Sequence, residues 1–215
     1  MHPTGAESVL VRHGDIGTKS DQVRRSMEGR LRENLAAALA ARDIDARVDR
    51  ERTRLYVRAP TVDGQSALEA ATDAVTDVFG VSSASPARRI EPNLAAISEA
   101  LSVTATAVYD GGSFAVRARR AGHANAHAFT SPDIESVGGA AVWDAAEAAG
   151  HTPRVDLDDP DQTFYVECRA DDAYVFLEKH SGPGGLPVGT QTPLVALISG
   201  GIDSPVAAYE MMKRG

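Results

Sequence analysis

A glycine turn near the end of the sequence has the residue types and the spacing of a phosphate-binding loop. Residues 199–204 (SGGIDS) follow the apolar run 194–198 (LVALI), which predicts a short buried strand. The pair Ser204-Pro205 after the turn is typical of a helix start. A strand, a glycine turn and a helix in this order aim the unpaired N–H groups of the first helical turn outwards, where pyrophosphate can accept hydrogen bonds from them.

The loop would have to neutralise phosphate charge without a lysine. No Gly-Lys-Ser/Thr follows the turn, so it is not a Walker-type loop. Neutralisation would fall to backbone N–H groups, to the hydroxyls of Ser199 and Ser204, and to a metal near Asp203. The alternative interpretation is an ordinary strand-to-helix turn of an α/β protein, but the strand before the turn and the helix start after it favour a phosphate site.

Two groups of basic side chains indicate nucleic-acid contact in a chain that is acidic as a whole. The chain has 22 Lys and Arg against 30 Asp and Glu, a formal net charge of −8, whereas residues 1–60 hold 12 basic and 9 acidic residues, a net +3. The first group lies at the start of a predicted helix, and the second borders a predicted strand. The six residues are Lys19, Arg24 and Arg25, and Arg117, Arg119 and Arg120. For each of them the alternative is a solvated surface charge.

Composition limits the class of protein further. Only three basic residues are lysine, and an acidic, lysine-poor surface is typical of proteins from a very salty cytoplasm. One cysteine, Cys168, excludes an internal disulfide and a multi-thiolate zinc site, and it is interpreted as a core residue of a strand. His123 and His127 lack a third ligand, so no metal-ligand set is predicted. No secretory signal and no apolar run of membrane-spanning length are present, so a cytoplasmic protein is expected.

The hydrophobic pattern of the first 60 residues predicts a small α+β unit of ferredoxin type. Residues 8–11 read as a strand, residues 20–42 as a helix with apolar residues at i+4, and residues 44–49 and 53–59 as two strands. The loop 13–17, which contains His13, is expected to be surface or packing structure.

The pattern continues with further helices and strands as far as a glycine- and proline-rich segment. Asp63 is expected to cap a helix over 65–78; the further elements are an extended stretch over 81–90 interrupted by Pro86, helices over 91–105 and 131–150, a strand over 113–119, and a hairpin of strands 163–169 and 173–179. The predicted segments are therefore 1–60, 61–180, a linker over 181–192 and a final strand and helix over 193–215. A parallel sheet cannot consist of one strand, so residues 193–215 should expose apolar surface.

Three separated motifs resemble one known family. The run beginning at Ser199 (SGGIDSPVA) resembles the signature of PP-loop ATP pyrophosphatases. Residues 184–189 (GGLPVG) and 11–19 (VRHGDIGTK) resemble the tRNA 4-thiouridine synthetase (ThiI, tRNA sulfurtransferase) family, in which the second motif usually reads Arg-Tyr-Gly-Glu-Ile; His13 and Asp15 are mild departures. The resemblance implies an α+β chain: a ferredoxin-like domain, an α/β THUMP domain and the first βα unit of a PP-loop domain, from a halophilic archaeon and truncated at its C-terminal side.

The resemblance also implies an activity. ATP, with Mg²⁺, would adenylate the C4 oxygen of a tRNA uridine, and sulfur from a persulfide, supplied by a cysteine desulfurase or another sulfide source, would then displace AMP. The implied essential carboxylate is Asp203. The implied nucleotide-binding residues are Ala196, Leu197, Ile198, Ser199, Gly200, Gly201, Asp203 and Ser204. The six basic residues named above would bind tRNA, and a homodimer and a role in thiamine biosynthesis are compatible with the family.

Other classes remain open. The chain could be a non-catalytic THUMP RNA-binding module, or another PP-loop enzyme that amidates a small molecule; a THUMP methyltransferase fits less well, because its cofactor glycines have a different pattern. The family's sulfur-handling cysteine and, in some members, a rhodanese domain lie further along, and Cys168 matches neither. This chain alone is therefore expected to bind tRNA weakly and to lack thiolation activity.

Overall fold

The computed structural model describes residues 1–51, 54–58, 65–121 and 127–215. The chain divides into two compact units, one made of residues 1–7 and 86–178 and the other of residues 8–85 and 179–215. We call them the 86–178 unit and the 8–85 unit. The expected helix cap at Asp63 and the histidine at position 123 lie outside the described residues.

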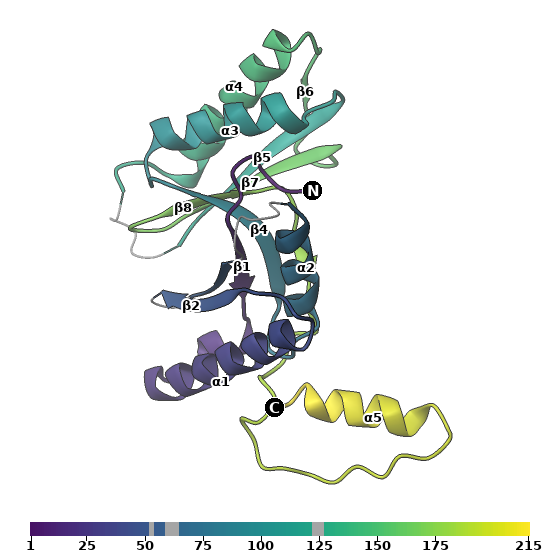
Figure 1. Ribbon diagram of the computed structural model, residues 1–215. Helices are drawn as coiled ribbons and strands as arrows, with labels where there is room; N and C mark the ends of the chain where they lie inside the picture. The colour runs from purple at the N-terminus through teal and green to yellow at the C-terminus, as the bar shows by residue number, and fades with distance from the viewer. Residues whose placement is uncertain (52–53, 59–64, 122–126) are drawn as a thin grey trace. The chain divides into compact units, whose positions relative to one another are not determined.

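The 8–85 unit combines helices with a small antiparallel sheet (Figure 1). Its elements are β1 (Ser8–Arg12), the 3-10 helix η1 (Asp15–Thr18), α1 (Asp21–Ala40), β2 (Arg47–Glu51), β3 (Arg54–Arg58), α2 (Gln65–Thr76), the first part of β4 (Ser83–Ile90), β9 (His180–Ser181) and α5 (Asp203–Met212). The strand order is β2-β3-β1-β4, and β9 also pairs with β4. The strand–helix–strand–strand order predicted from the sequence is confirmed.

Helix α1 forms where the apolar residues recur every four positions. Met27, Leu31, Leu35 and Leu39 are buried and place one face of α1 against β2 and α2. Val23, which extends the same series by one turn, is 41% exposed instead. The apolar stripe is therefore one turn shorter than the periodicity predicts.

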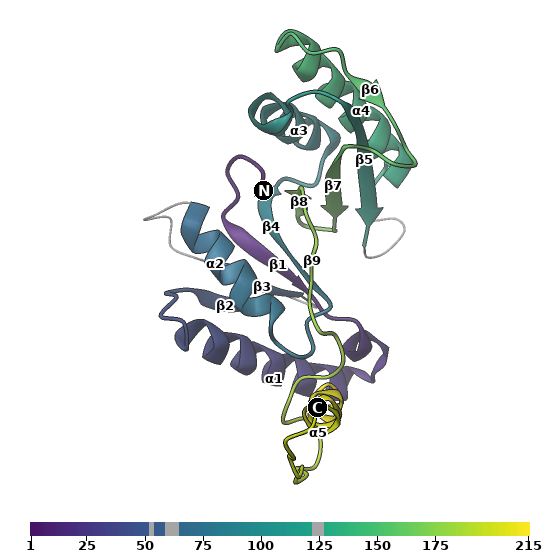
Figure 2. The ribbon, with the colours of Figure 1, turned by 90° about the vertical axis from the view of Figure 1, so that its right-hand side faces the viewer.

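The 86–178 unit is a mixed sheet with helices on one face (Figure 2). Its elements are the second part of β4, α3 (Leu94–Val108), β5 (Ser113–Arg120), α4 (Ser131–Ala148), β6 (Arg154–Val155), β7 (Gln162–Cys168) and β8 (Ala173–Phe176). The strand order is β4-β8-β7-β5-β6, with β5 parallel to β6 and β7 and the other pairs antiparallel. Ile97, Leu101 and Ile134 of the helices bury Phe114 and Phe164 of the sheet.

The start of α4 follows the predicted chemistry with a shifted cap. The sequence favours a start at Ser131-Pro132-Asp133, but Thr130 is the cap residue: its hydroxyl accepts from the Asp133 N–H, and the Asp133 carboxylate accepts from the Thr130 N–H. The hydroxyl of Ser131 accepts from the N–H of Arg120 instead. The reciprocal pair stabilises the helix start better than a single cap.

Several predicted limits differ from the observed ones. Helix α3 begins at Leu94 rather than Glu91, because the Asn93 side chain caps it by accepting from the N–H of Ala96. Strand β4 passes through Pro86 without the expected interruption.

The contacts group helix α2 with β1–β3, although the sequence analysis put it in the second segment. Units defined by contacts need not coincide with domains, so the limits near 60 and 180 stay a prediction.

The final strand expected at 194–198 is not formed, although the helix after it is. Val195 is 90% exposed, Leu197 89% and Ile198 60%. The expectation that this segment exposes apolar surface is confirmed, and the physical reason is that a parallel strand gains its hydrogen bonds and its cover only from neighbouring strands and helices. None of the helices in the described stretches is both long and apolar enough to cross a membrane.

Candidate functional site

Side-chain hydroxyls close the loop 199–204 at the start of α5. The Oγ of Ser204 accepts from the Ser199 N–H at 2.9 Å, and the two serine Oγ atoms lie 3.1 Å apart. The Gly201 N–H points to the Ser199 Oγ at 3.4 Å. Asp203 stands in the first turn of α5 and is exposed. The loop therefore brings two hydroxyls and one carboxylate to the N-terminal end of a helix, where an anion is favoured.

The two glycines of the loop leave open space beside it. Neither has a positive φ. A Cβ built at Gly200 would meet no described atom within 4 Å, and one at Gly201 would meet only the Ser199 Oγ at 3.7 Å. The fold of the described residues thus does not itself demand glycine here. The room suits a ligand that approaches the backbone closely.

The extended segment 194–198 before the loop borders an apolar groove of about 500 Å³. Leu194 and Ala196 line it on one side, and Ala208, Met211 and Met212 of α5 line it on the other. Of the predicted nucleotide-binding residues, the structure brings Ser199, Gly201 and Ser204 into contact with one another. Ala196, Leu197 and Ile198 are exposed without a paired strand.

The alternation of β5 separates its three arginines. Arg117 and Arg119 pair in register with Tyr165 and Glu167 of β7 and are exposed. Arg120 pairs with Cys168, whose side chain belongs to the core beneath the helices. Its guanidinium is partly buried and donates to the Phe129 carbonyl.

Position on the sheet thus gives the three arginines different surroundings. Because β-strand side chains alternate between faces, Arg117 and Arg119 lie on the face away from α3 and α4, and Arg120 lies on the helix side. Arg117 also donates to the Leu157 carbonyl.

The basic residues near α1 also differ in surroundings. Arg24 is ion-paired with Asp21 at 2.8 Å and lies 3.9 Å from the Glu28 carboxylate. Lys19 and Arg25 are exposed, and Arg25 lines a groove of about 400 Å³ between α1 and residues 189–190.

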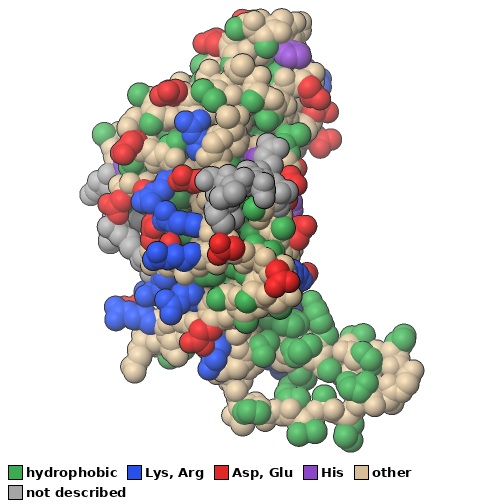
Figure 3. Space-filling view, viewed as in Figure 1, with side chains coloured by type: hydrophobic (Ala, Val, Ile, Leu, Met, Phe, Trp, Pro, Cys, Tyr) green, Lys and Arg blue, Asp and Glu red, His purple; other side chains and the backbone are tan. Residues whose placement is uncertain are grey.

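Sequence reasoning missed a third arginine group, on β2 and β3. Figure 3 shows basic side chains gathered over β2. Arg47 and Arg58 both reach the carboxylate of Asp49, at 2.5 and 3.1 Å. The signal was present, because residues 47–58 contain five arginines.

A buried carboxylate ties the loop after β1 to the sheet. Glu28 of α1 has a side chain only 1% exposed and accepts from Arg50 at 2.7–2.8 Å. The His13 ring lies 3.5 Å from the same carboxylate and is 7% exposed, so His13 is a packing residue. The three residues come from a loop, a helix and a strand, so this cluster fixes the motif residues 11–19 against the sheet.

Cys168 is buried, and burial raises the pKa of its thiol. A thiol held in its neutral form is a poor nucleophile, in agreement with its interpretation as a core residue. Among the residues that the structure describes, no group of three or more His, Cys, Asp or Glu could hold a metal ion.

Family models and solved structures match the chain along most of its length. The ThiI ferredoxin-like domain matches residues 8–85, the THUMP domain residues 92–178, and the thiamine biosynthesis protein (ThiI) model residues 189–215. A probable tRNA sulfurtransferase of Halobacterium salinarum is 57% identical over 215 residues, which are 100% of this chain and 52% of that protein.

Two solved structures share the fold. One is PH1313 from Pyrococcus horikoshii, with a TM-score of 0.79 and 28% identity, covering 97% of this chain and 66% of that one. The other is a 4-thiouridine synthetase in complex with RNA and bound ATP, with a TM-score of 0.73 and 26% identity, covering 98% of this chain and 50% of that one.

The fold and the loop thus define a mixed α+β protein in which a ferredoxin-like domain and a THUMP domain precede a glycine-rich loop and its helix. The chain belongs to the ThiI family, of whose members it carries the ferredoxin-like domain, the THUMP domain and the start of the ThiI domain. It spans about half the length of the curated relatives it matches. The predicted α+β architecture and the predicted family are confirmed.

Proposed function

We propose that this chain is the tRNA-binding part of a tRNA sulfurtransferase that makes 4-thiouridine in the cytoplasm, together with the start of the part that binds ATP to activate the uridine. The observation that carries the proposal is the order of three parts in one chain: a ferredoxin-like domain, a THUMP domain, and a hydroxyl-lined loop at the N-terminus of α5. The solved 4-thiouridine synthetase holds both RNA and ATP, which supports the same assignment here.

The loop residues fit the phosphates of ATP with Mg²⁺. The space beside Gly200 lets an anion approach the backbone closely. The Ser199 and Ser204 hydroxyls can donate hydrogen bonds to phosphate oxygens. The exposed carboxylate of Asp203 is a hard oxygen ligand of the kind that Mg²⁺ prefers, and its proposed role is to hold that ion. ATP, when bound, supplies the adenylate that makes the uridine oxygen a good leaving group. The backbone of Ala196–Ile198 would line the nucleotide.

The sulfur must come from outside the described residues. Their one thiol, Cys168, is buried and held neutral. A persulfide donor, such as a cysteine desulfurase, is therefore part of the proposal.

RNA contact is proposed for the exposed basic residues. Lys19, Arg25, Arg117 and Arg119 are exposed and can meet phosphates directly. Arg24 and Arg120 are only partly exposed and have protein partners of their own, so each is proposed to position the exposed basic residues of its own unit. The narrow, deep major groove of RNA makes phosphate and shape contacts the expected mode for a tRNA stem.

Replacing Arg117 and Arg119 together with alanine should weaken tRNA binding about tenfold and reduce the dependence of log K on log salt by about 0.7–0.9 for each phosphate that the variant no longer neutralises. The measurement is fluorescence anisotropy with a labelled tRNA transcript over a range of KCl concentrations. Arg120→Ala is the matched control from the same strand. It should lower the unfolding midpoint, and it should weaken tRNA binding less than the double variant does. An unchanged affinity in the double variant would remove this face from the proposal.

Nucleotide binding is tested at Asp203. Adding ATP with Mg²⁺ should shift the amide resonances of residues 199–204, and Asp203→Asn should abolish the Mg²⁺-dependent part of the shift. Glu210→Gln on the exposed part of the same helix is the control. If ATP leaves these resonances unmoved, the nucleotide role of the loop is refuted while the RNA role can stand.

A second candidate function is a non-catalytic RNA-binding module. The exposed, unpaired segment 194–198 favours it for the chain taken alone. Weak tRNA binding without any ATP-dependent thiolation is the expected behaviour of this chain by itself, because thiolation needs a reactive sulfur and the one thiol among the described residues, Cys168, is buried.

A further inference from the structure

Residues 180–191, which we call the strap, run along the edge of the 8–85 unit. Strand β9 pairs with β4, and the pattern continues beyond it: the Gly182 N–H donates to the Ser82 carbonyl, and the Gly184 N–H donates to the Val81 carbonyl at 2.8 Å. The Gly80 N–H donates back to the Gly184 carbonyl at 2.8 Å. The strap is therefore bonded to residues 80–84 as a strand-like ribbon and is not a free tether.

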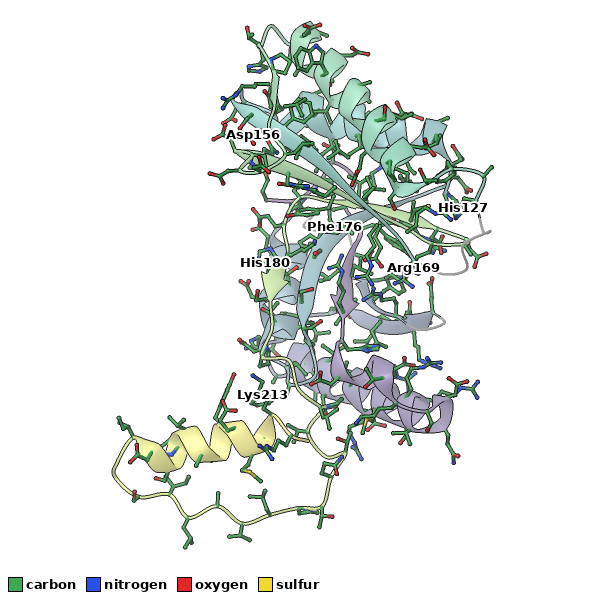
Figure 4. All side chains as sticks on the ribbon, turned by 180° about the vertical axis from the view of Figure 1, so that it is seen from behind. His127, Asp156, Arg169, Phe176, His180 and Lys213 are labelled. Atoms are coloured by element: carbon green, nitrogen blue, oxygen red, sulfur yellow. The ribbon has the colours of Figure 1, made fainter. Side chains whose placement is uncertain are left out.

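The strap also holds the far end of α5. The Leu186 N–H donates to the Lys213 carbonyl at 2.9 Å, and the Gln191 N–H donates to the Gly215 carbonyl at 2.8 Å. Lys213 is the C-cap of α5 and its carbonyl has no partner within the helix, so the strap supplies what α5 itself cannot; Gly215 lies beyond the helix, and its bond to Gln191 holds the residues that follow α5. Figure 4 shows Lys213 at this end of α5, next to the strap.

Two further contacts fix these parts to the same unit. The ring of Tyr209 on α5 packs on Phe79, with 5.0 Å between the ring centroids. Asn34 of α1 donates to the Val188 carbonyl of the strap at 3.0 Å.

Gly185 is the residue that permits this docking. Its φ is +73°, and a Cβ there would lie 2.1 Å from the Lys213 carbonyl oxygen. The neighbouring Gly184 has nearly the same backbone, with a φ of +68°, but a Cβ there would meet no described atom within 4 Å. Any side chain at 185 must therefore push the end of α5 away, whereas at 184 it adds only local backbone strain.

We propose that Gly185 is a positioning residue: by letting the end of α5 dock on the strap, it fixes where the loop 199–204 stands relative to α1. This inference rests on the proposed nucleotide role of that loop. Helix α5 has 10 residues and is about 15 Å long, so displacing one end turns the helix and carries the loop at the other end with it. The ferredoxin-like domain, residues 8–85, then holds the nucleotide loop in one position through the strap and α5.

The test is a distance measurement between two spin labels, at Ala36→Cys on the exposed side of α1 and at Ile202→Cys within the loop, with Cys168→Ala as background. Pulsed electron–electron double resonance should give one narrow distance distribution for the doubly labelled protein and for the same protein with Gly184→Ala. Gly185→Ala should broaden or shift it, and Gly185→Val should do so further. Equal distributions for the 184 and 185 variants would overturn the proposal.

Amide hydrogen exchange of the unchanged chain tests the strap without relying on any variant to fold. The amides of Leu186 and Gln191 should exchange at least tenfold more slowly than unstructured amides; free exchange at both overturns the proposal. Neither measurement uses nucleotide, so a failure of ATP to bind refutes the proposed function and leaves the outcome for the strap to be decided separately.

Discussion

Glu28 is an acidic residue that the fold buries, and its partners come from elsewhere in the chain. Its carboxylate meets the Arg50 guanidinium from β2 and the His13 ring from the loop after β1. A buried charge without a partner is far more costly than a paired one, so each member of this cluster depends on the others. The cluster is thus a fixed point for residues 11–19, one of the three motifs that carry the family resemblance.

Glu28→Gln should therefore destabilise the 8–85 unit by about 1.5–3 kcal/mol, because Arg50 loses a charged hydrogen-bond partner but, being 34% exposed, keeps part of its hydration. Urea unfolding measures the change. Glu33→Gln on the same helix is the matched control: its partner Arg30 is 2.9 Å away, but both side chains are about half exposed, so the loss should stay below about 1 kcal/mol. Equal losses for the two variants would contradict the buried role of Glu28.

Asp161 makes the stability of the 86–178 unit depend on pH. Its carboxylate accepts from the Ser113 hydroxyl at 2.6 Å and from the Ser113 N–H at 2.7 Å, and these hydrogen bonds hold its pKa below the ordinary value. Such a group stabilises the fold above the pKa of the unfolded chain, about 3.9, and the contribution is lost as pH falls through the lower folded value.

The urea midpoint of the wild type should accordingly fall between about pH 5 and pH 2 more steeply than that of Asp161→Asn. Asp158→Asn, an exposed residue of the same loop, should keep the wild-type slope. Parallel curves for Asp161→Asn and the wild type would show that the hydrogen bonds to Ser113 do not favour the ionised form.

At the scale of elements, α3 and α4 approach each other through a glycine. A Cβ at Gly138 of α4 would lie 2.6 Å from the Leu101 Cδ1 and 3.2 Å from the Val116 Cγ1. Leu101 is fully buried, so its side chain has little room to move. The next residue, Gly139, would meet no described atom within 4 Å.

Gly138→Ala should destabilise the 86–178 unit by about 1–2 kcal/mol, because overpacking outweighs the gain in helix propensity. Gly139→Ala on the solvent side should stabilise it by about 0.5–1 kcal/mol. Thermal unfolding of both variants distinguishes packing from helix propensity. A gain of stability in both variants would mean that the Leu101 side chain can move aside to make room for the Cβ.

At the scale of the whole molecule, the segment 192–202 is uncharged and exposes a row of large apolar side chains. An uncharged, apolar segment with unpaired backbone groups is a template for pairing with another chain. Any protein surface that covers these side chains would suppress such pairing.

The chain should self-associate as its concentration rises, and Leu197→Lys should reduce that association. Analytical ultracentrifugation gives the measurement. Val103→Lys, at an exposed apolar position of α3, should leave the association unchanged. A wild type that stays monomeric at high concentration would contradict the template role of residues 194–198.

Much of the fold could be predicted because it follows local rules. The i+4 series of α1, the alternation of β5 and the proline near the start of α4 each act within a few residues, and the structure confirms the elements they predict. Even the failure of a lone strand at 194–198 to pack was foreseeable. The alternation of β5 does not show which face of the strand α3 and α4 cover. It therefore could not show that Arg120 lies on the helix side and Arg119 on the other.

The sequence by itself determined the family, the mixed α+β class, the order of helices and strands and the composition of the phosphate-type loop, since motifs and periodicity are properties of neighbouring residues. Tertiary structure alone decided that His13, Glu28 and Arg50 meet, that Arg47 and Arg58 share one carboxylate, and that Gly185 faces the end of α5. Apart from Arg47–Asp49, these contacts join residues 9 to 28 positions apart, and no local propensity encodes a contact between residues so far apart in the sequence. Packing of whole elements sets them.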